Sequence, residues 1–414
     1  MASKFYNFVI VGAGPAGLTA GIVAARNGFK AIVLEKGDKA GPKPRGEGMK
    51  HFPLVDEILG DGFLPSIGTY SAPTSVFHSP GDLNVVEIQR KGYKHHFFHW
   101  RKFIDRFVEV AKEAGVDLLL NCEVTEPIEK DNICVGVKYK DKSGKVQEVY
   151  GNAVFGCGGY ESVIGRAFGL DYGKMNCPIM KCLVSNGNID TDKTPGLQFF
   201  LIGNGDLEYA PNFPQCVAYV FPIGGKNLEI GLMLRMMKAF KMKTIKKPSV
   251  AQFMEVWEKV KKECPGFSEF LKGSKIEYEE LTALPNAKLA DKVVPNPGAV
   301  LIGDSAGFVE ASGSSGLYFS MAMAKFWVET LGKKLRQLFG AGKEIAEHNH
   351  DLWSTENIEN YMAEWDENEV NKHIKKVYKL VGILEWYVFK RRRTSERINK
   401  RWKLIKWMFN KGLG

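Results

Sequence analysis

The chain opens on a short apolar run, FYNFVIV at residues 5–11, that ends at a glycine-rich turn. Short continuous apolar runs bounded by glycine are typical of the buried strands of parallel sheets. The alanine-rich residues 16–27 predict a helix, and KAIVLEK at 30–36 predicts a second strand. This order of strand, helix and strand is that of a nucleotide-binding α/β unit.

A different pattern occupies the middle of the chain. Residues 175–235 alternate apolar and polar positions between Pro, Gly and Asn turns, which predicts an antiparallel sheet. A helix is expected at 249–263, capped by Ser249 and ended before Pro265. A strand at 299–302 then leads into a second glycine-rich turn and a long helix.

The composition changes after residue 340, and residues 344–389 are again helical in pattern. The expected fold class is therefore α/β, or α+β overall, with an antiparallel-sheet domain interleaved in a Rossmann-like nucleotide-binding domain. Three parts are predicted: residues 1–170 with 286–340, residues 171–285, and a helical C-terminal extension at 341–414. The pattern leaves open whether part of 50–100 belongs to the antiparallel-sheet domain.

The net charge of +10 is concentrated in one segment. Residues 390–411 hold ten bases and one acid, so this segment carries +9 and leaves +1 for the rest of the chain. At helical spacing, the apolar side chains of this segment form a stripe that consists of Ile398, Trp402, Ile405 and Phe409. Most of the bases fall outside this stripe. Such a basic amphipathic helix is typical of a protein that binds the membrane interface.

We therefore expect contact with anionic lipid headgroups through Arg391, Arg392, Arg393, Trp402 and Trp407. One alternative stays open, in which the stripe covers the protein's own core or a partner subunit. Binding of nucleic acid is not expected, because nothing else in the chain resembles a nucleic-acid module.

No apolar stretch reaches the roughly 18 residues that a membrane-spanning helix needs. Only a few residues precede the first strand, so we expect no signal peptide and a cytoplasmic protein, peripheral on the inner face of the membrane. The seven cysteines are scattered without a CxxC pair or a His cluster. Reduced thiols and no metal site are the expectation.

The first glycine-rich turn has GxGxxG spacing, with Gly12, Gly14 and Gly17. The first glycine makes the tight turn, the second lets a pyrophosphate approach the backbone, and the third lets the helix pack closely on the strand. Phosphates then sit at the N-terminus of the helix. Glu35 ends the second strand, where it is placed to accept hydrogen bonds from a ribose. The turn therefore predicts binding of an adenine dinucleotide.

A downstream stretch, GAVLIGDSAGFVEASGSSGLYFSMAMAK at 298–325, indicates which dinucleotide. It resembles the FAD-dependent oxidoreductases built like aromatic-ring hydroxylases, and especially their geranylgeranyl reductase branch. The resemblance implies that Asp304 holds the ribityl chain of FAD. It also implies that a helix beginning at about 314–316 points its N-terminus at the N1/C2=O edge of the isoalloxazine, where reduction places negative charge.

The same resemblance assigns further residues to the cofactor. In VFGCGGYESVIGR (154–166), Gly158 replaces the family's usual aspartate, which argues against an NADPH-driven monooxygenase. Arg101 lies in a segment that runs close to the cofactor in the family. The residues expected at FAD are Gly12, Gly14, Pro15, Ala16, Gly17, Glu35, Lys36, Arg45, Gly46, Arg101, Val124, Gly158, Gly303, Asp304, Gly313, Ser314, Ser315 and Gly316.

Two stretches resemble landmarks of the reductase branch. VAYVFPIGGKNLEIGLML at 217–234 is similar to the signature aromatic-x-Trp-x-Phe-Pro followed by Gly-x-Gly, with Tyr219 in place of the tryptophan. PKPRGEGMK at 42–50 is similar to the Cys-Gly-Glu/Asp landmark, with Arg45 in place of the cysteine. The resemblance places Tyr219, Phe221 and Pro222 in the substrate pocket, although an ordinary sheet core would show the same apolar pattern.

The resemblance implies reduction of C=C bonds in the prenyl (geranylgeranyl) chains of membrane lipids by hydride from reduced flavin. A proton must reach the second carbon, and Glu47 and Tyr219 are the candidate catalytic residues. The electron donor stays open among ferredoxin, deazaflavin and nicotinamide. Two other functions stay open as well: a flavin monooxygenase of an aromatic or lipophilic compound, and a flavin-containing electron-relay or binding protein.

Overall fold

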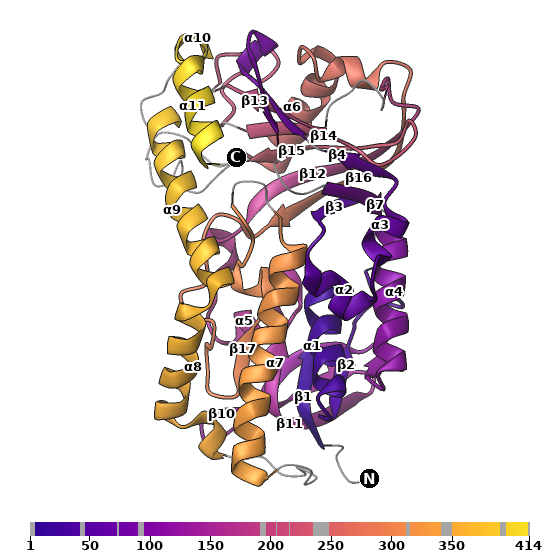
Figure 1. Ribbon diagram of the computed structural model, residues 1–414, viewed down its shortest axis with the longest axis vertical. Helices are drawn as coiled ribbons and strands as arrows, with labels where there is room; N and C mark the ends of the chain where they lie inside the picture. The colour runs from indigo at the N-terminus through magenta and orange to yellow at the C-terminus, as the bar shows by residue number, and fades with distance from the viewer. Residues whose placement is uncertain are drawn as a thin grey trace.

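The computed structural model describes residues 5–41, 46–72, 74–89, 95–190, 196–203, 205–214, 216–234, 248–311, 315–340, 350–389 and 395–412. Two large sheets follow one another along the long axis of the molecule, and C-terminal helices run along one side of both (Figure 1). The remaining strands of the described ranges form a small three-stranded sheet.

The first sheet contains the predicted nucleotide-binding unit. β1 (Phe5–Val11), α1 (Pro15–Arg26) and β2 (Ala31–Leu34) follow in order, which confirms the elements expected from the apolar pattern. β1 pairs in parallel with β2 on one side and with β11 (Val146–Gly156) on the other. The sheet also contains β8 (Asp117–Leu119), β9 (Glu123–Lys130), β10 (Ile133–Lys140) and β17 (Ala299–Leu301).

Helices cover this sheet and bring distant segments to α1. α4 (Trp100–Glu113) and α7 (Leu317–Phe339) both contact α1. The parallel strands β1, β2, β11 and β17 end at one edge, and in parallel α/β sheets that edge is where ligands bind. The shorter helices are α2 (Pro53–Leu59), α3 (Phe63–Ile67) and α5 (Val163–Ala167).

The second sheet has the strand order β16-β12-β15-β14-β13-β5-β6. Its strands are β5 (Thr74–His78), β6 (Val85–Gln89), β12 (Cys177–Ser185), β13 (Leu197–Ile202), β14 (Cys216–Pro222), β15 (Leu228–Leu234) and β16 (Lys275–Leu284). All neighbours pair antiparallel except β5 and β13, so the antiparallel sheet expected over 175–235 is confirmed. β5 and β6 come from the segment that the sequence pattern left unassigned.

The two faces of the second sheet have different partners because side chains alternate along each strand. One face packs on α6 (Val250–Glu263), with Met180 and Val220 in the same core cluster as Phe253 and Trp257. Ser249 caps this helix as expected, in a capping box with its N3 residue. The opposite face carries Lys181 and Tyr219 and lines a cavity. We call it the cavity face.

The small sheet has the order β3-β7-β4 and consists of β3 (Gly46–Lys50), β4 (Tyr70–Ala72) and β7 (His95–His99). β3 contacts both α7 and β15. It therefore connects the first large sheet with the cavity face of the second.

The C-terminal helices span both halves of the molecule (Figure 1). They are α8 (Thr355–Glu367), α9 (Glu369–Phe389), α10 (Ser395–Lys400) and α11 (Trp402–Gly412). α8 packs through Trp365 on Phe308 and Trp327, and the Tyr378 hydroxyl of α9 donates to Gly307 O at 3.0 Å. Within the described ranges, none of the helices combines the length and the apolar character that crossing a membrane requires.

The structure corrects one expectation about the tail. Trp402 is only 5% exposed and packs with Ile398 and Ile405 on Val86 and Ile88 of the second sheet. The stripe faces the protein's own core because its helical spacing places these three side chains on one side of α10 and α11. The predicted contact of Trp402 with a membrane is therefore wrong, whereas Trp407 is 59% exposed. Arg391, Arg392 and Arg393 lie outside the described residues.

All seven cysteines are buried and unbridged. This agrees with the reduced thiols expected from their scattered positions in the sequence.

Candidate active site

A cavity of about 1240 Å³ lies between the strand ends of the first sheet and the cavity face of the second. Pockets for one ligand usually enclose about 300 to 1,000 Å³. The cavity is therefore large enough for more than one bound group. Its walls include the N-terminal ends of α1 and α7, part of β3, and several residues of α9.

The three glycines of the first turn act differently in the structure. Gly12 has a φ of +108°, and a Cβ there would lie 2.6 Å from Cys157 O. A Cβ at Gly17 would lie 1.9 Å from Gly12 O, so only glycine allows α1 to approach the turn this closely. Gly14, the N-cap of α1, has nothing within 4 Å of its missing Cβ and faces the cavity.

The start of α1 is therefore open to an anion. Its N-cap, Gly14, makes no side-chain capping hydrogen bond. The first N–H groups of a helix have no intrahelical partners, and the helix dipole favours negative charge at this end. Pro15 and Ala16 of the same turn also line the cavity, so a pyrophosphate would fit against the backbone here.

Glu35 lies next to this turn in a fixed orientation. One carboxylate oxygen accepts a hydrogen bond from Ala13 N at 2.8 Å, and the other accepts from Gly37 N at 2.9 Å. Each carboxylate oxygen has a further lone pair, which leaves acceptor capacity for ribose hydroxyls. Lys36 and Val124 line the same end of the cavity, as expected for the adenosine side of a dinucleotide.

A second helix, α7, begins close to the start of α1: a Cβ at Gly303 would lie 2.8 Å from Ser320 Cβ of α7 and 3.5 Å from Ala16 Cβ of α1. Gly316 is the N-cap of α7 and makes no side-chain capping hydrogen bond. A Cβ at Gly316 would lie 3.1 Å from Asp304 Oδ1, so the predicted ribityl-binding carboxylate lies beside the helix start. Asp304, Ser315 and Gly316 all line the cavity. Two uncapped helix N-termini thus line one cavity, where different negatively charged parts of one extended cofactor can meet them.

The remaining predicted cofactor residues divide into three groups. Gly158 lines the cavity. Gly17, Gly46, Gly303 and Arg101 are not among the described residues that line it; the Arg101 guanidinium donates to Ala40 O and Gly41 O at 2.8 and 3.1 Å. Arg45, Gly313 and Ser314 lie outside the described residues.

Four polar side chains meet at the centre of the cavity wall. Lys181 Nζ lies 3.0 Å from Glu47 Oε1 and 3.5 Å from Glu229 Oε1. The Tyr219 hydroxyl donates to Glu229 Oε1 at 3.4 Å. All four line the cavity, and we call them the acid–base cluster. Glu47 and Tyr219 were expected from the sequence; Lys181 and Glu229 were missed.

Sheet register brings the acid–base cluster together. Gly231 of β15 pairs with Lys181 on one neighbouring strand and with Tyr219 on the other. A Cβ at Gly231 would lie 2.5 Å from the Tyr219 ring, so the glycine makes room for that ring. The signal in the sequence was a single charge inside each of two apolar runs, CPIMKCLV and NLEIGLML.

Burial, together with the Glu229 and Glu47 carboxylates, raises the pKa of Tyr219 well above its ordinary value. Both causes disfavour the phenolate. The hydroxyl is therefore protonated at physiological pH, as it would already be at its ordinary pKa.

Outside the acid–base cluster, the described side chains of the second sheet that line the cavity are apolar or aromatic, except Ser75. Phe221 lies 4.5 Å from the Tyr219 ring, and Phe199 stacks on Phe77 at 4.9 Å between ring centroids. These side chains line the cavity, whereas the predicted pocket residue Pro222 is not among the described lining residues. Such a surface fits a hydrocarbon chain better than a polar substrate.

The C-terminal extension also contributes to the wall, which sequence reasoning did not anticipate. Glu369, Val370, His373 and Val377 of α9 line the cavity. The His373 ring stacks on Phe319 of α7 at 5.6 Å and an interplanar angle of 6°. Because Phe319 follows the start of α7 directly, α9 helps to fix the end of the cavity where that helix begins.

Comparisons with known proteins agree with this site. The family model described as FAD dependent oxidoreductase matches residues 7–170. Digeranylgeranylglycerophospholipid reductase 1 of Methanococcoides burtonii is 30% identical over 307 residues, covering 73% of this chain and 68% of that protein. Reductase 2 of the same organism is 28% identical over 355 residues, covering 84% and 80%.

Solved structures share the fold. A geranylgeranyl bacteriochlorophyll reductase-like protein from Thermoplasma acidophilum superposes with a TM-score of 0.71 at 17% identity, covering 99% of this chain and 98% of that one. The myxobacterial chondrochloren halogenase superposes with a TM-score of 0.65 at 15% identity, covering 98% and 91%. At these identities the likeness concerns the fold alone.

Proposed function

This chain belongs to the geranylgeranyl reductase-like FAD-dependent oxidoreductases, and from that membership we propose that it reduces C=C bonds in the prenyl chains of membrane lipids. Its cofactor is FAD. One observation carries the choice of substrate: the acid–base cluster lies in the same cavity as both uncapped helix ends and an aromatic, apolar sheet face.

The residues present fit the cofactor. Gly14 would place the pyrophosphate against the start of α1, Glu35 would accept from the adenosine ribose, and Asp304 would hold the ribityl chain. The free N–H groups at the start of α7 would stabilise negative charge on the isoalloxazine. The cofactor supplies hydride to one carbon of the double bond when it is bound and reduced.

The protein's own side chains supply the proton and exclude water from the reacting double bond. In the proposed reaction, the Tyr219 hydroxyl gives its proton to the second carbon as the first accepts hydride. Tyr219 then regains a proton through Glu229, which first receives one from the Lys181 ammonium, and Lys181 is reprotonated by way of Glu47. Glu47 is the most exposed of the three charged members of the cluster, so we assign it the exchange of protons with water. The aromatic face around Tyr219 excludes water from the reacting bond.

The tail supports a peripheral position on the inner face of the cytoplasmic membrane. Five bases on the outer side of α10 and α11 are exposed: Arg397, Lys400, Arg401, Lys403 and Lys406. Leu404 and Trp407 are 40% and 59% exposed on the same helix. Leu83 and Val85 are also exposed, and they belong to the turn and strand on which the tail packs. Exposed bases beside apolar side chains favour an anionic bilayer.

An anaerobic assay tests the reductase function. Holoenzyme reduced with dithionite is incubated with vesicles containing digeranylgeranylglycerophospholipid, and the lipids are analysed by mass spectrometry. We expect a gain of two hydrogens for each reduced bond. Unchanged lipid would contradict the proposal, and an oxygenated product formed with NADPH and O₂ would identify a monooxygenase instead. Ferredoxin, a deazaflavin and a nicotinamide can then be compared as the natural electron donor.

A further inference from the structure

A row of directly opposed residues crosses the cavity face toward the tail. Tyr219 of β14 pairs with Phe199 of β13, Phe199 pairs with Phe77 of β5, and Phe77 pairs with Val86 of β6. Directly opposed residues in neighbouring strands project from the same face of a sheet. The row spans three strand spacings, or about 14 Å, from the acid–base cluster to the sheet edge.

The tail packs at the far end of this row. Ile398, Trp402 and Ile405 form one buried cluster with Val86 and Ile88, and Phe77 and Leu201 pack against it. Phe77 and Ile88 also line the cavity. These two side chains therefore have the cavity on one side and the tail cluster on the other.

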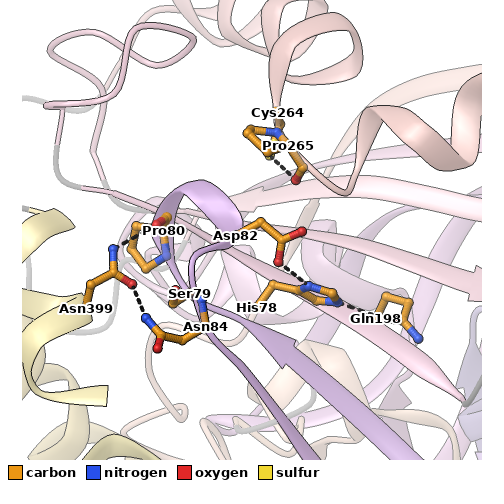
Figure 2. Close-up of polar contacts among 9 residues, drawn as sticks. All are labelled: His78, Ser79, Pro80, Asp82, Asn84, Gln198, Cys264, Pro265 and Asn399. Atoms are coloured by element: carbon orange, nitrogen blue, oxygen red, sulfur yellow. Dashed lines mark hydrogen bonds and ion pairs between the residues drawn. The ribbon is translucent and has the colours of Figure 1, made fainter.

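Hydrogen bonds fix the tail in this position. Ser395 N and Oγ donate to the two carboxylate oxygens of Asp206 at 2.6 and 2.7 Å. The Asn399 amide donates to Pro80 O at 2.9 Å and accepts from Asn84 Nδ2 at 3.1 Å (Figure 2). The tail is thus held both at the start of α10 and along the turn between β5 and β6.

That turn is itself held from the other side. His78 Nδ1 lies 2.7 Å from Asp82 Oδ1, and His78 Nε2 lies 2.8 Å from Gln198 Oε1 (Figure 2). The Ser79 hydroxyl accepts from Asn84 N at 2.9 Å. Hydrogen bonds therefore hold the turn between β5 and β6, the two strands that carry Phe77 and Ile88, and the tail packs against this fixed turn.

Trp402 contributes bulk rather than a polar contact. Its indole N–H is buried and has no hydrogen-bond partner in the part of the chain that the structure describes. An unpaired buried donor costs about 1 to 3 kcal/mol. A tryptophan at this position is best explained by the volume that its ring fills behind the cavity wall.

We propose that Trp402, with Ile398 and Ile405, supports the end wall of the hydrocarbon part of the cavity and so limits the length of prenyl chain that the protein accepts. The inference rests on the proposed function, because it takes a prenyl chain as the ligand. Trp402 is a specificity-determining residue that acts through Phe77 and Ile88, and it is not itself a catalytic residue.

Binding to oxidised holoenzyme tests the wall without requiring turnover. The affinities of farnesyl, geranylgeranyl and geranylfarnesyl diphosphate are measured by changes in flavin fluorescence. Trp402→Ala should raise the affinity for geranylfarnesyl relative to geranylgeranyl diphosphate by about tenfold, since a pocket distinguishes small differences in hydrocarbon size by this order. Trp407→Ala, the matched control on the exposed side of the same helix, should leave the ratio unchanged.

A second pair of variants keeps the test decisive if Trp402→Ala does not fold. Trp402→Phe retains a ring and should change the ratio less than twofold. Ile88→Trp fills the same end from the cavity side and should shift preference toward farnesyl diphosphate. An unchanged ratio in folded Trp402→Ala, an Ile88→Trp variant without that shift, or no binding of any of the three chains would overturn the proposal. If the preference shifts but no lipid is reduced, the wall stands and the reductase function fails.

Discussion

Lys181 Nζ lies 3.0 Å from Glu47 Oε1, across the junction between the second large sheet and the small sheet. The two residues are 134 positions apart in the sequence. This ion pair connects β3 to the cavity face, and through Glu229 it reaches the Tyr219 hydroxyl. The position of the proposed proton donor therefore depends on contacts between three separate strands and β3.

Replacing Tyr219 by Phe should slow lipid reduction by about a hundredfold or more, the usual contribution of a positioned general acid. The ring is retained, so binding of FAD and of prenyl diphosphate should stay within twofold. Stopped-flow reoxidation of reduced holoenzyme by lipid, under anaerobic conditions, measures the step directly. An unchanged single-turnover rate would remove Tyr219 from the mechanism.

Replacing Lys181 by Met should destabilise the protein by about 3 kcal/mol, because it leaves the Glu47 and Glu229 carboxylates near one another without their shared cation. Urea unfolding of the holoenzyme measures the change. Lys174→Met is the control: its ion pair with Asp171 is exposed, so its loss should cost no more than about 1 kcal/mol. An equal loss in the free energy of unfolding for the two variants would show that the ion pairs of Lys181 stabilise the protein no more than an exposed ion pair does.

Gly14→Ala and Gly17→Ala should separate cofactor binding from folding. A Cβ at Gly14 meets nothing within 4 Å and projects into open space by the cavity, so stability should hold while FAD affinity falls at least about tenfold. A Cβ at Gly17 would collide with Gly12 O, so this variant should lose folded protein. Flavin titration and thermal unfolding distinguish the two outcomes. The prediction fails if Gly14→Ala binds FAD normally.

Neutralising two tail bases should weaken membrane binding. Lys403→Gln with Lys406→Gln removes two exposed charges, which costs about 2 kcal/mol or roughly thirtyfold in binding to anionic vesicles. Flotation with phosphatidylserine vesicles at physiological salt is the measurement. Lys272→Gln with Lys275→Gln removes two exposed charges outside the tail and serves as the control. Equal flotation of all these proteins would exclude the tail as the contact.

The buried thiols predict alkaline destabilisation. Burial raises the pKa of Cys134, Cys182 and Cys264 from 9.0 to about 12. Unfolded thiols ionise above pH 9 while the folded ones do not, so these groups leave stability unchanged below pH 9 and lower it as pH rises from 9 toward 12. Each contributes up to about 1.4 kcal/mol per pH unit. In urea unfolding between pH 8 and 11, Cys264→Ala should show a smaller slope than the unmodified protein.

The local sequence pattern was sufficient to predict the nucleotide-binding unit. A buried strand, a glycine turn and a helix follow one another within residues 5–27, so their geometry depends on neighbours in sequence. The glycines are required by close approaches inside that same unit, as the contact of Gly17 with Gly12 O illustrates. The boundaries predicted for the three domains remain a prediction.

Two features were decided only by the tertiary structure. Lys181 and Glu229 meet Glu47 and Tyr219 through the register of β12, β14 and β15 and the approach of β3, and no local pattern specifies that register. The apolar stripe of the tail predicted a helix that buries one side, but helical spacing carries no information about what covers it. The edge of the cavity face is an apolar surface within the same molecule on which Trp402 packs. Burial there removes the Trp402 side chain from water as fully as a bilayer would.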